Sequence, residues 1–202
     1  TLWTKVIGGD SIDVAYDVEE VWNGGFAVVG YTKQNLTLNS GYDVWLIRTD
    51  PNGNILWTRT YGGDGDDFGY SIKKTNDGGF IIAGTTNSFG AGQFDFYIVR
   101  TDSIGDTLWT RTFGEMNNDY GWSVEPSIDG GFVVAGEINA FPLLPDGMVV
   151  KIDSNGQAQW VKIYSTLLGE KLYSIKQSND GGFVTTGTLY LGNQDVAGWL
   201  LK

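Results

Sequence analysis

Four acidic side chains recur at one position of an internal repeat, ten residues after a tryptophan. The tryptophans are Trp3, Trp57, Trp109 and Trp160, which lie 54, 52 and 51 residues apart. The acidic column that follows them is Asp13, Asp67, Asp119 and Glu170. If the repeats are arranged about a central channel, these carboxylates could form a ring at the mouth of that channel. A bound cation such as Ca²⁺ would then relieve the repulsion between them.

The alternative for the acidic column is a structural role inside each repeat. Each carboxylate would then accept hydrogen bonds from the backbone or from a serine of its own repeat, namely Ser71, Ser123 or Ser174. A feature present in every repeat is usually architectural, so we expect this second role. The segment 64–67, Asp-Gly-Asp-Asp, has the oxygens of a calcium loop but lacks the downstream glutamate of known loops.

Amide and aromatic residues gather in the connections after the third strand of each repeat, which are long and differ from one repeat to the next. The candidate ligand-binding residues there are Asn35, Asn87, Phe89, Phe141 and Tyr190. Loop residues that are free of the repeat's constraints often carry function. This mixture suits a neutral sugar or another protein surface, and the alternative is a set of plain solvated loops.

A second column of the repeat is aromatic and follows the acidic column by three residues. Its members are Tyr16, Tyr70, Trp122 and Tyr173. Each stands two residues before an apolar residue, so strict alternation predicts that both lie on one strand face. We expect packing between sheets to explain this column, with stacking on a ligand as the alternative.

Composition excludes several classes of chemistry. The 202 residues include no Cys and no His, so disulfides, thiolate sites, imidazole bases and His-bound zinc are excluded. The net charge of −11 disfavours nucleic acid and favours cations or neutral polar ligands. No apolar run approaches the roughly 18 residues of a membrane span, and the first residues lack a signal-peptide pattern, so we expect a soluble chain.

Tight turns must position these residues, because a turn signal recurs four times. It reads Asp-Gly-Gly-Phe at residues 77–80, 129–132 and 180–183, and Asn-Gly-Gly-Phe at 23–26. Asn or Asp followed by Gly predicts a two-residue hairpin turn, and apolar residues follow each signal. Within one period we expect strands at 55–61, 69–74, 80–84 and 94–101.

The third and fourth strands of each repeat are apolar on both faces, as in Phe26-Ala27-Val28-Val29. Such strands need cover on both sides, which sheets arranged radially about an axis provide. We therefore predict an all-β chain, a β-propeller of four blades with four antiparallel strands each. The N-terminal strand would close the last blade, within one domain over 1–202 (repeats 3–56, 57–108, 109–159, and 160–202 plus 1–2). The alternative is an eight-bladed ring of two chains.

These motifs resemble a repeat family of bacterial and archaeal surface or secreted proteins with Asp-Gly-Gly-Phe followed by Asp-x-x-Gly-x-x-x-Trp. Its repeats look like Kelch or quinoprotein propeller blades. The chain departs from these families at two points, so no cofactor site is carried over from them. Residues 50–57 are one residue short of the tryptophan-docking motif, and the Gly pair precedes the strand. The resemblance implies an extracellular or cell-surface protein.

We therefore expect a non-enzymatic binding module that recognises a glycan or a protein through acidic upper-face loops. It would be a monomer or a homodimer, without nucleic-acid partners or membrane insertion. The alternatives are a structural repeat domain stabilised by Ca²⁺, or a glycoside hydrolase that works with paired carboxylates. No other cofactor is expected.

Overall fold

The chain is all-β in the computed structural model, which describes residues 2–22, 24–33, 41–139, 144–192 and 195–202. No helix occurs among these residues, and so none that could cross a membrane. The strands are β1 (Asp13–Glu20), β2 (Phe26–Thr32), β3 (Asp43–Thr49), β4 (Ile55–Tyr61), β5 (Asp67–Lys74), β6 (Phe80–Thr86), β7 (Asp95–Thr101), β8 (Thr107–Phe113), β9 (Tyr120–Pro126), β10 (Phe132–Ile138), β11 (Asp146–Ile152), β12 (Ala158–Tyr164), β13 (Glu170–Gln177), β14 (Phe183–Gly192) and β15 (Asp195–Leu201).

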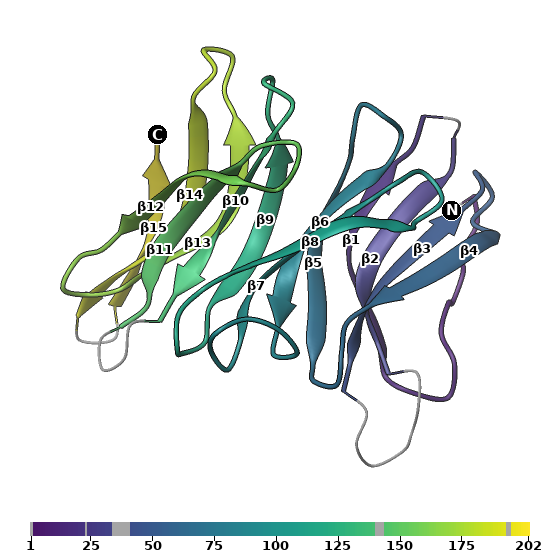
Figure 1. The fold of residues 1–202 in the computed structure, drawn as a ribbon, viewed down its shortest axis with the longest axis horizontal. Coiled ribbons are helices and arrows are strands. Elements are labelled where there is room, and N and C mark those ends of the chain that lie inside the picture. The colour runs from purple at the N-terminus through teal and green to yellow at the C-terminus, as the bar shows by residue number, and fades with distance from the viewer. Residues whose placement is uncertain (1, 23, 34–40, 140–143, 193–194) are drawn as a thin grey trace.

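Four antiparallel sheets stand side by side in a row (Figure 1). The first three are β1-β2-β3-β4, β5-β6-β7-β8 and β9-β10-β11-β12, and the last is β13-β14-β15. The strands predicted in one period match β4 to β7, with differences of a few residues at the ends. A sheet is offset from the sequence repeat by one strand, because the strand bearing the tryptophan pairs with the preceding sheet.

The recurring turn has a three-residue loop, so the prediction of a two-residue turn was wrong. In the second sheet the Thr75 N–H donates to the Gly79 carbonyl (2.9 Å), and the Gly78 N–H donates to the Thr75 carbonyl (2.9 Å). Gly78 has a φ of 86°, a backbone conformation that would be strained in a residue with a side chain. The Asp77 carboxylate accepts a hydrogen bond from the Gly79 N–H and forms an ion pair with Arg100. The spacing repeated within the chain therefore fixes both the turn and a side-chain anchor.

The core lies between the sheets rather than within one of them. Ile82 and Val99 of the second sheet pack against Val29 and Leu46 of the first. The opposite face of the second sheet packs against the third, and the third against the fourth. Every residue of β6, β7, β10 and β11 is buried. The prediction that strands apolar on both faces are flanked by neighbouring sheets is therefore confirmed for the two middle sheets.

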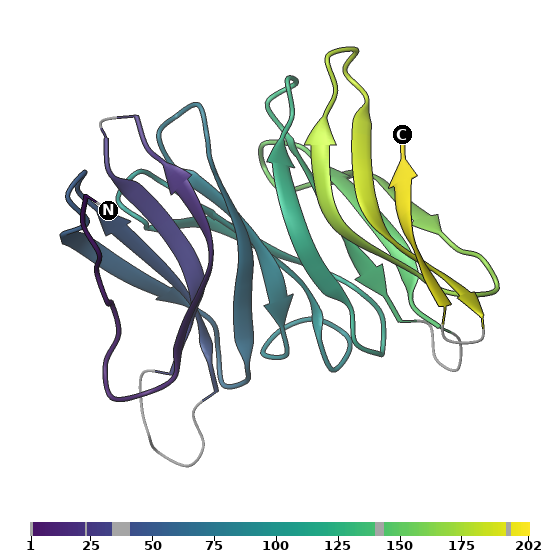
Figure 2. The ribbon, with the colours of Figure 1, turned by 180° about the vertical axis from the view of Figure 1, so that it is seen from behind.

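The row is open, with the first and last sheets at opposite ends (Figures 1 and 2). The N-terminal segment lies on the outside of the first sheet, where Trp3 contacts Phe26 and the Lys5 ammonium donates to Asn54 (3.0 Å). The last sheet consequently has three strands in the described part of the chain. The prediction that the N-terminal strand closes the last blade was wrong, because residues 2–7 lie at the first sheet and the last sheet, β13-β14-β15, lies at the opposite end of the open row.

Candidate functional site

A β-bulge interrupts the innermost strand of every sheet, always at the aromatic column. The inner strands β1, β5, β9 and β13 are neighbours across the row. Their pairing skips one residue each, and the skipped residues are Tyr16, Tyr70, Trp122 and Tyr173. A bulged residue leaves the ladder and its side chain is re-aimed. Tyr70 accordingly lies outside the core cluster that contains Ile72, so the prediction that the two share one strand face was wrong.

The four bulged side chains form a continuous aromatic row across the four sheets. Ring centroids are 5.1 Å apart between Tyr16 and Tyr70, 4.6 Å between Tyr70 and Trp122, and 6.2 Å between Trp122 and Tyr173. The two end rings are exposed, at 54% for Tyr16 and 46% for Tyr173, and the two middle rings are half-buried. The expected packing between sheets is thus present, and each of the four residues is at least partly exposed.

Further aromatic side chains contact this row or one another beside it. Phe68 lies 4.9 Å from Tyr31 and 6.1 Å from Phe94, and Tyr120 lies 6.0 Å from Phe94, measured between ring centroids. Phe68 is stacked on Tyr70, and Tyr120 on Trp122. Burial raises the pKa of the Tyr31, Tyr70 and Tyr120 phenols above their usual value. The surface therefore combines apolar ring faces with neutral hydroxyl groups.

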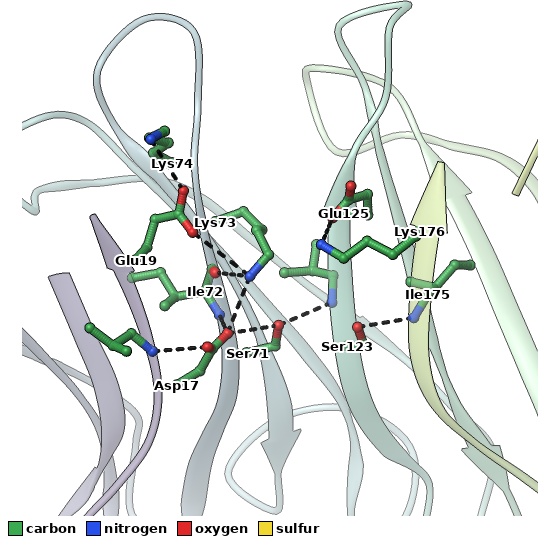
Figure 3. Close-up of polar contacts among 12 residues, drawn as sticks. Asp17, Glu19, Ser71, Ile72, Lys73, Lys74, Ser123, Glu125, Ile175 and Lys176 are labelled. Atoms are coloured by element: carbon green, nitrogen blue, oxygen red, sulfur yellow. Dashed lines mark hydrogen bonds and ion pairs between the residues drawn. The ribbon is translucent and has the colours of Figure 1, made fainter. Parts of the chain in front are cut away.

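A polar ladder holds the inner strands at this spacing (Figure 3). The backbone N–H of Ile72 donates to the Asp17 carboxylate (2.9 Å) on the preceding inner strand. In the same way the Val124 N–H donates to Ser71 Oγ (3.4 Å), and the Ile175 N–H to Ser123 Oγ (3.2 Å). Each side chain of the ladder directly follows a bulged aromatic residue, so the ladder fixes the distances within the aromatic row.

The ladder corrects one expectation about the serines. Ser71 and Ser123 were expected to serve the acidic column of their own repeats, but they accept hydrogen bonds from the next inner strand instead. Ser71 also donates to Asp17 (3.3 Å), whose carboxylate pairs with the Lys73 ammonium (3.4 Å). Ser174, at the same position of the last sheet, is exposed.

Each carboxylate of the acidic column closes the loop that leads into its inner strand. The backbone N–H groups of Gly9, Gly63, Glu115 and Thr166 donate to Asp13, Asp67, Asp119 and Glu170, at 2.8, 2.9, 2.6 and 3.1 Å. Asp67, Asp119 and Glu170 are fully buried. The expectation of backbone hydrogen bonds is confirmed, whereas no group of three metal-ligating side chains occurs in the described part of the chain.

A second carboxyl group accompanies Asp67, Asp119 and Glu170, the last of which lies near Asp146, and sequence reasoning missed these pairs. A methyl group placed on Gly62 would overlap the carboxylates of both Asp43 and Asp67, and one on Gly114 would overlap those of Asp95 and Asp119. Burial, with a smaller contribution from Asp95, raises the pKa of Asp119 to about 6. Burial first and Asp67 second raise the pKa of Asp43. The signal was the recurrent Asp at the start of β3, β7 and β11.

The predicted loop residues have separate surroundings. Asn87 Oδ1 accepts a hydrogen bond from the Asp66 N–H (3.0 Å), which is a structural contact. Phe89 is partly exposed and lies against Tyr97, with centroids 5.8 Å apart. Tyr190 is half-buried on β14. Asn35 and Phe141 lie outside the described residues.

Comparisons with known proteins find likeness in fold. No family model matches the chain. Regulatory protein FlaEY of Caulobacter vibrioides is 26% identical over 107 residues, which cover 46% of this chain and 11% of that protein. A protein of unknown function from Bacteroides caccae has a TM-score of 0.55 at 13% identity, covering 99% of this chain and 64% of its own.

A second solved structure, a candidate exo-β-1,3-galactanase from Bifidobacterium bifidum, has a TM-score of 0.50 at 13% identity and covers 91% of this chain and 65% of its own. The chain thus spans less than two thirds of both solved structures and about a tenth of the regulatory protein. At this identity the two structures show an all-β fold of the same kind.

Proposed function

We propose that the chain is an arc of a β-propeller that acts as a non-enzymatic binding module and recognises a neutral glycan through the aromatic row. The observation that carries this proposal is the repeated bulge, which brings one aromatic ring from each sheet into line along the inner strands. Bulges often re-aim side chains near functional sites. The face-to-face stacking of sheets and the repeat motifs support the propeller arrangement.

A neutral, extended ligand fits the chemistry of this surface. Tyr and Trp offer a broad apolar face and a polar edge, a combination that suits sugars, whose faces are apolar and whose rims bear hydroxyl groups. Several rings in line favour a polymer over a single small molecule. The net charge of −11 disfavours nucleic acid and other polyanions. We place the protein at the cell surface or outside the cell, as the family resemblance implies.

The two alternatives have less support from the described residues. A glycoside hydrolase needs a carboxyl pair that a substrate can reach, yet Asp67, Asp95 and Asp119 are at most 1% exposed. A structural domain stabilised by Ca²⁺ needs a cluster of oxygen ligands, and the acidic column instead binds the backbone of its own loops. The competing binding surface is the set of upper-face loops, which would recognise a protein.

A panel of neutral linear glycans, including β-1,3-linked galactan, tests the proposal by titration calorimetry. Trp122→Leu keeps apolar bulk but removes a central ring, so we expect affinity to fall about tenfold, or about 1.4 kcal/mol. Phe89→Leu is the matched control in a loop and should bind like the unmodified chain. Far-ultraviolet circular dichroism and thermal melting check that both variants fold.

The result separates the two surfaces. A loss of binding in Phe89→Leu with unchanged binding in Trp122→Leu would assign recognition to the loops. The absence of binding to every neutral glycan would overturn the proposed ligand class.

A further inference from the structure

The last residue of each inner strand differs between the sheets, and it decides how neighbouring sheets meet at that end of the strands. These residues are Glu20, Lys74, Pro126 and Gln177. At the junction of the first and second sheets the Lys74 ammonium donates to the Glu20 carbonyl (3.0 Å), and it pairs with the Glu19 carboxylate (3.6 Å; Figure 3). Lys74 therefore bridges these two sheets.

Gln177 bridges the third and fourth sheets at the same place. Its Oε1 atom accepts a hydrogen bond from the Ile128 N–H (2.9 Å), and its Nε2 atom donates to Ser127 Oγ (3.4 Å). Both partners belong to the recurring turn of the third sheet, between β9 and β10. At both of these junctions, a polar side chain at the end of the inner strand thus joins it to the preceding sheet.

The junction between the second and third sheets has Pro126 at this position. Proline has no polar side-chain group and no backbone N–H, so it cannot form either kind of bridge. A pocket of about 390 Å³ lies at this junction and is lined by Pro126 and by turns of both sheets. A methyl group placed on Gly130 in this lining would meet no atom within 4 Å, whereas one on Gly78 would meet Ser103. The pocket therefore opens where the polar bridge is absent.

Aromatic and aliphatic side chains form one part of the lining. The Trp109 indole N–H donates to the Ser154 carbonyl (3.1 Å), which fixes the ring against the turn between β11 and β12. Phe132 is buried and lies 6.2 Å from Trp109, measured between ring centroids. Leu108, which is exposed, and Pro126 add aliphatic surface. This apolar surface is therefore held in place without a ligand.

The polar part of the lining is electrically balanced. Asp77 and Arg100 are its charged residues, and they pair with each other. The Arg100 guanidinium also donates to the carbonyls of Phe80 and Thr101, so its donors are already engaged. A cation or an anion would therefore meet a charge that already has a partner. The remaining side-chain groups include the exposed amides of Asn76 and Asn155.

We propose that this pocket binds a single neutral sugar unit. Small-molecule sites are concave and mostly apolar, with a few polar groups that fix orientation, and their volumes begin at about 300 Å³. An indole suits the apolar face of a sugar ring, and the amides of Asn76 and Asn155 can donate to and accept from its hydroxyl groups. Trp109 and Pro126 exclude water from one side of the ring.

The pocket is a second site, separate from the aromatic row. Thr75 and Ser127 line it, and they follow Tyr70 and Trp122 of the row by five residues along the inner strands. Five residues of extended strand span about 16 Å. A single sugar unit in the pocket therefore does not touch the row, and the proposal does not depend on recognition of a polymer there.

Saturation-transfer difference NMR with the methyl glycosides of neutral hexoses, galactose and glucose among them, tests the pocket. We expect saturable binding of at least one glycoside to the unmodified chain. Pro126→Gln introduces the residue that bridges the next junction, and its amide should reach the Asn76 N–H and the Thr75 hydroxyl as Gln177 reaches their equivalents. Binding should weaken at least tenfold. Glu20→Gln, the same replacement at the exposed equivalent position of the first sheet, should bind like the unmodified chain.

Asn155→Ala gives a second, milder test, because its exposed side chain lies in a turn and its loss should leave the fold intact. Removal of one hydrogen-bonding amide should weaken binding about three- to tenfold. Thermal melting checks that each variant folds. If Pro126→Gln does not fold, unchanged binding in folded Asn155→Ala would overturn the proposal.

Three other results would also overturn it. The first is no saturable binding of any glycoside, including the case in which the pocket takes a peptide instead. The second is unchanged binding in folded Pro126→Gln. The third is loss of glycoside binding in Trp122→Leu, because that would assign single sugars to the aromatic row. We expect Trp122→Leu to leave this binding unchanged, so failure of the pocket and failure of the aromatic row can be told apart.

Discussion

The middle sheets and the end sheets carry the same apolar sequence pattern, but only in the middle sheets are the apolar positions of both faces buried. Ile98 in the second sheet and Leu200 in the last sheet stand at one position of the pattern, and the first is buried while the second is mostly exposed. The apolar pattern therefore encodes a junction between two sheets rather than a buried location. At the ends of the described row, the same positions of the pattern are exposed.

The largest expected difference between these regions lies in their apolar side chains. Ile98→Ala removes a buried side chain between two sheets and leaves a cavity, so the free energy of unfolding should fall by about 2 to 5 kcal/mol. Leu200→Ala at the equivalent exposed position should change it by less than about 0.5 kcal/mol. Urea denaturation followed by tryptophan fluorescence measures both.

Leu200→Ala changes an exposed position and should be nearly neutral. A loss of several kcal/mol there would mean that Leu200 is covered within the chain, against the open arrangement of the four sheets.

Most strands and the burial of the middle sheets could be predicted from the sequence, because both depend on local patterns. The turn signal at 77–80 and the apolar run after it are sufficient to place β6. The closure of the row could not be predicted this way. The sequence around Trp3 fits an outer strand whether the segment pairs with the last sheet or lies apart from it against the first sheet. Which arrangement forms depends on the angle between sheets, and this angle is set by packing across whole faces.

The candidate site was predictable in its residues but not in its geometry. The aromatic column was evident from spacing, yet strict alternation placed Tyr70 with Ile72 because a bulge leaves no mark in the hydrophobic pattern. The partner of Asp67 was missed for a different reason. Asp43 lies on another strand of the repeat, and only the close approach of both carboxylates to Gly62 reveals the pair.

A smaller difference is expected between the cations that anchor the recurring turn. The buried Arg100 guanidinium donates to the Asp77 carboxylate and to the Phe80 carbonyl (3.2 Å). Lys202 is the equivalent at the open end, and its ion pair with Asp180 is exposed on both sides. Arg100→Met leaves a buried carbonyl without this donor, so stability should fall by about 1 to 3 kcal/mol.

Lys202→Met is the matched control, and no resolvable shift of the denaturation midpoint is expected, because exposed ion pairs contribute little. Equal losses in the two variants would show that the turn anchor works independently of burial, and the contrast between middle and end sheets would not extend to polar contacts.

The smallest expected effect is a pH dependence confined to the buried carboxyl pairs. The pKa of Asp119 is raised to about 6, against about 3.9 in an unfolded chain, so the folded state binds the proton more tightly. Its contribution to stability is therefore complete below about pH 4 and is lost as the pH rises through about 6. Asp119→Asn cannot ionise there, so the stability of the unmodified chain relative to this variant should fall by about 1 kcal/mol between pH 5 and pH 7. Urea denaturation across this range measures the difference, with Leu200→Ala as a non-titrating control that should run parallel to the unmodified chain.

A relative stability that instead rises with pH would mean that the Glu115 and Asn139 N–H donors to Asp119 outweigh the cost of burying its charge.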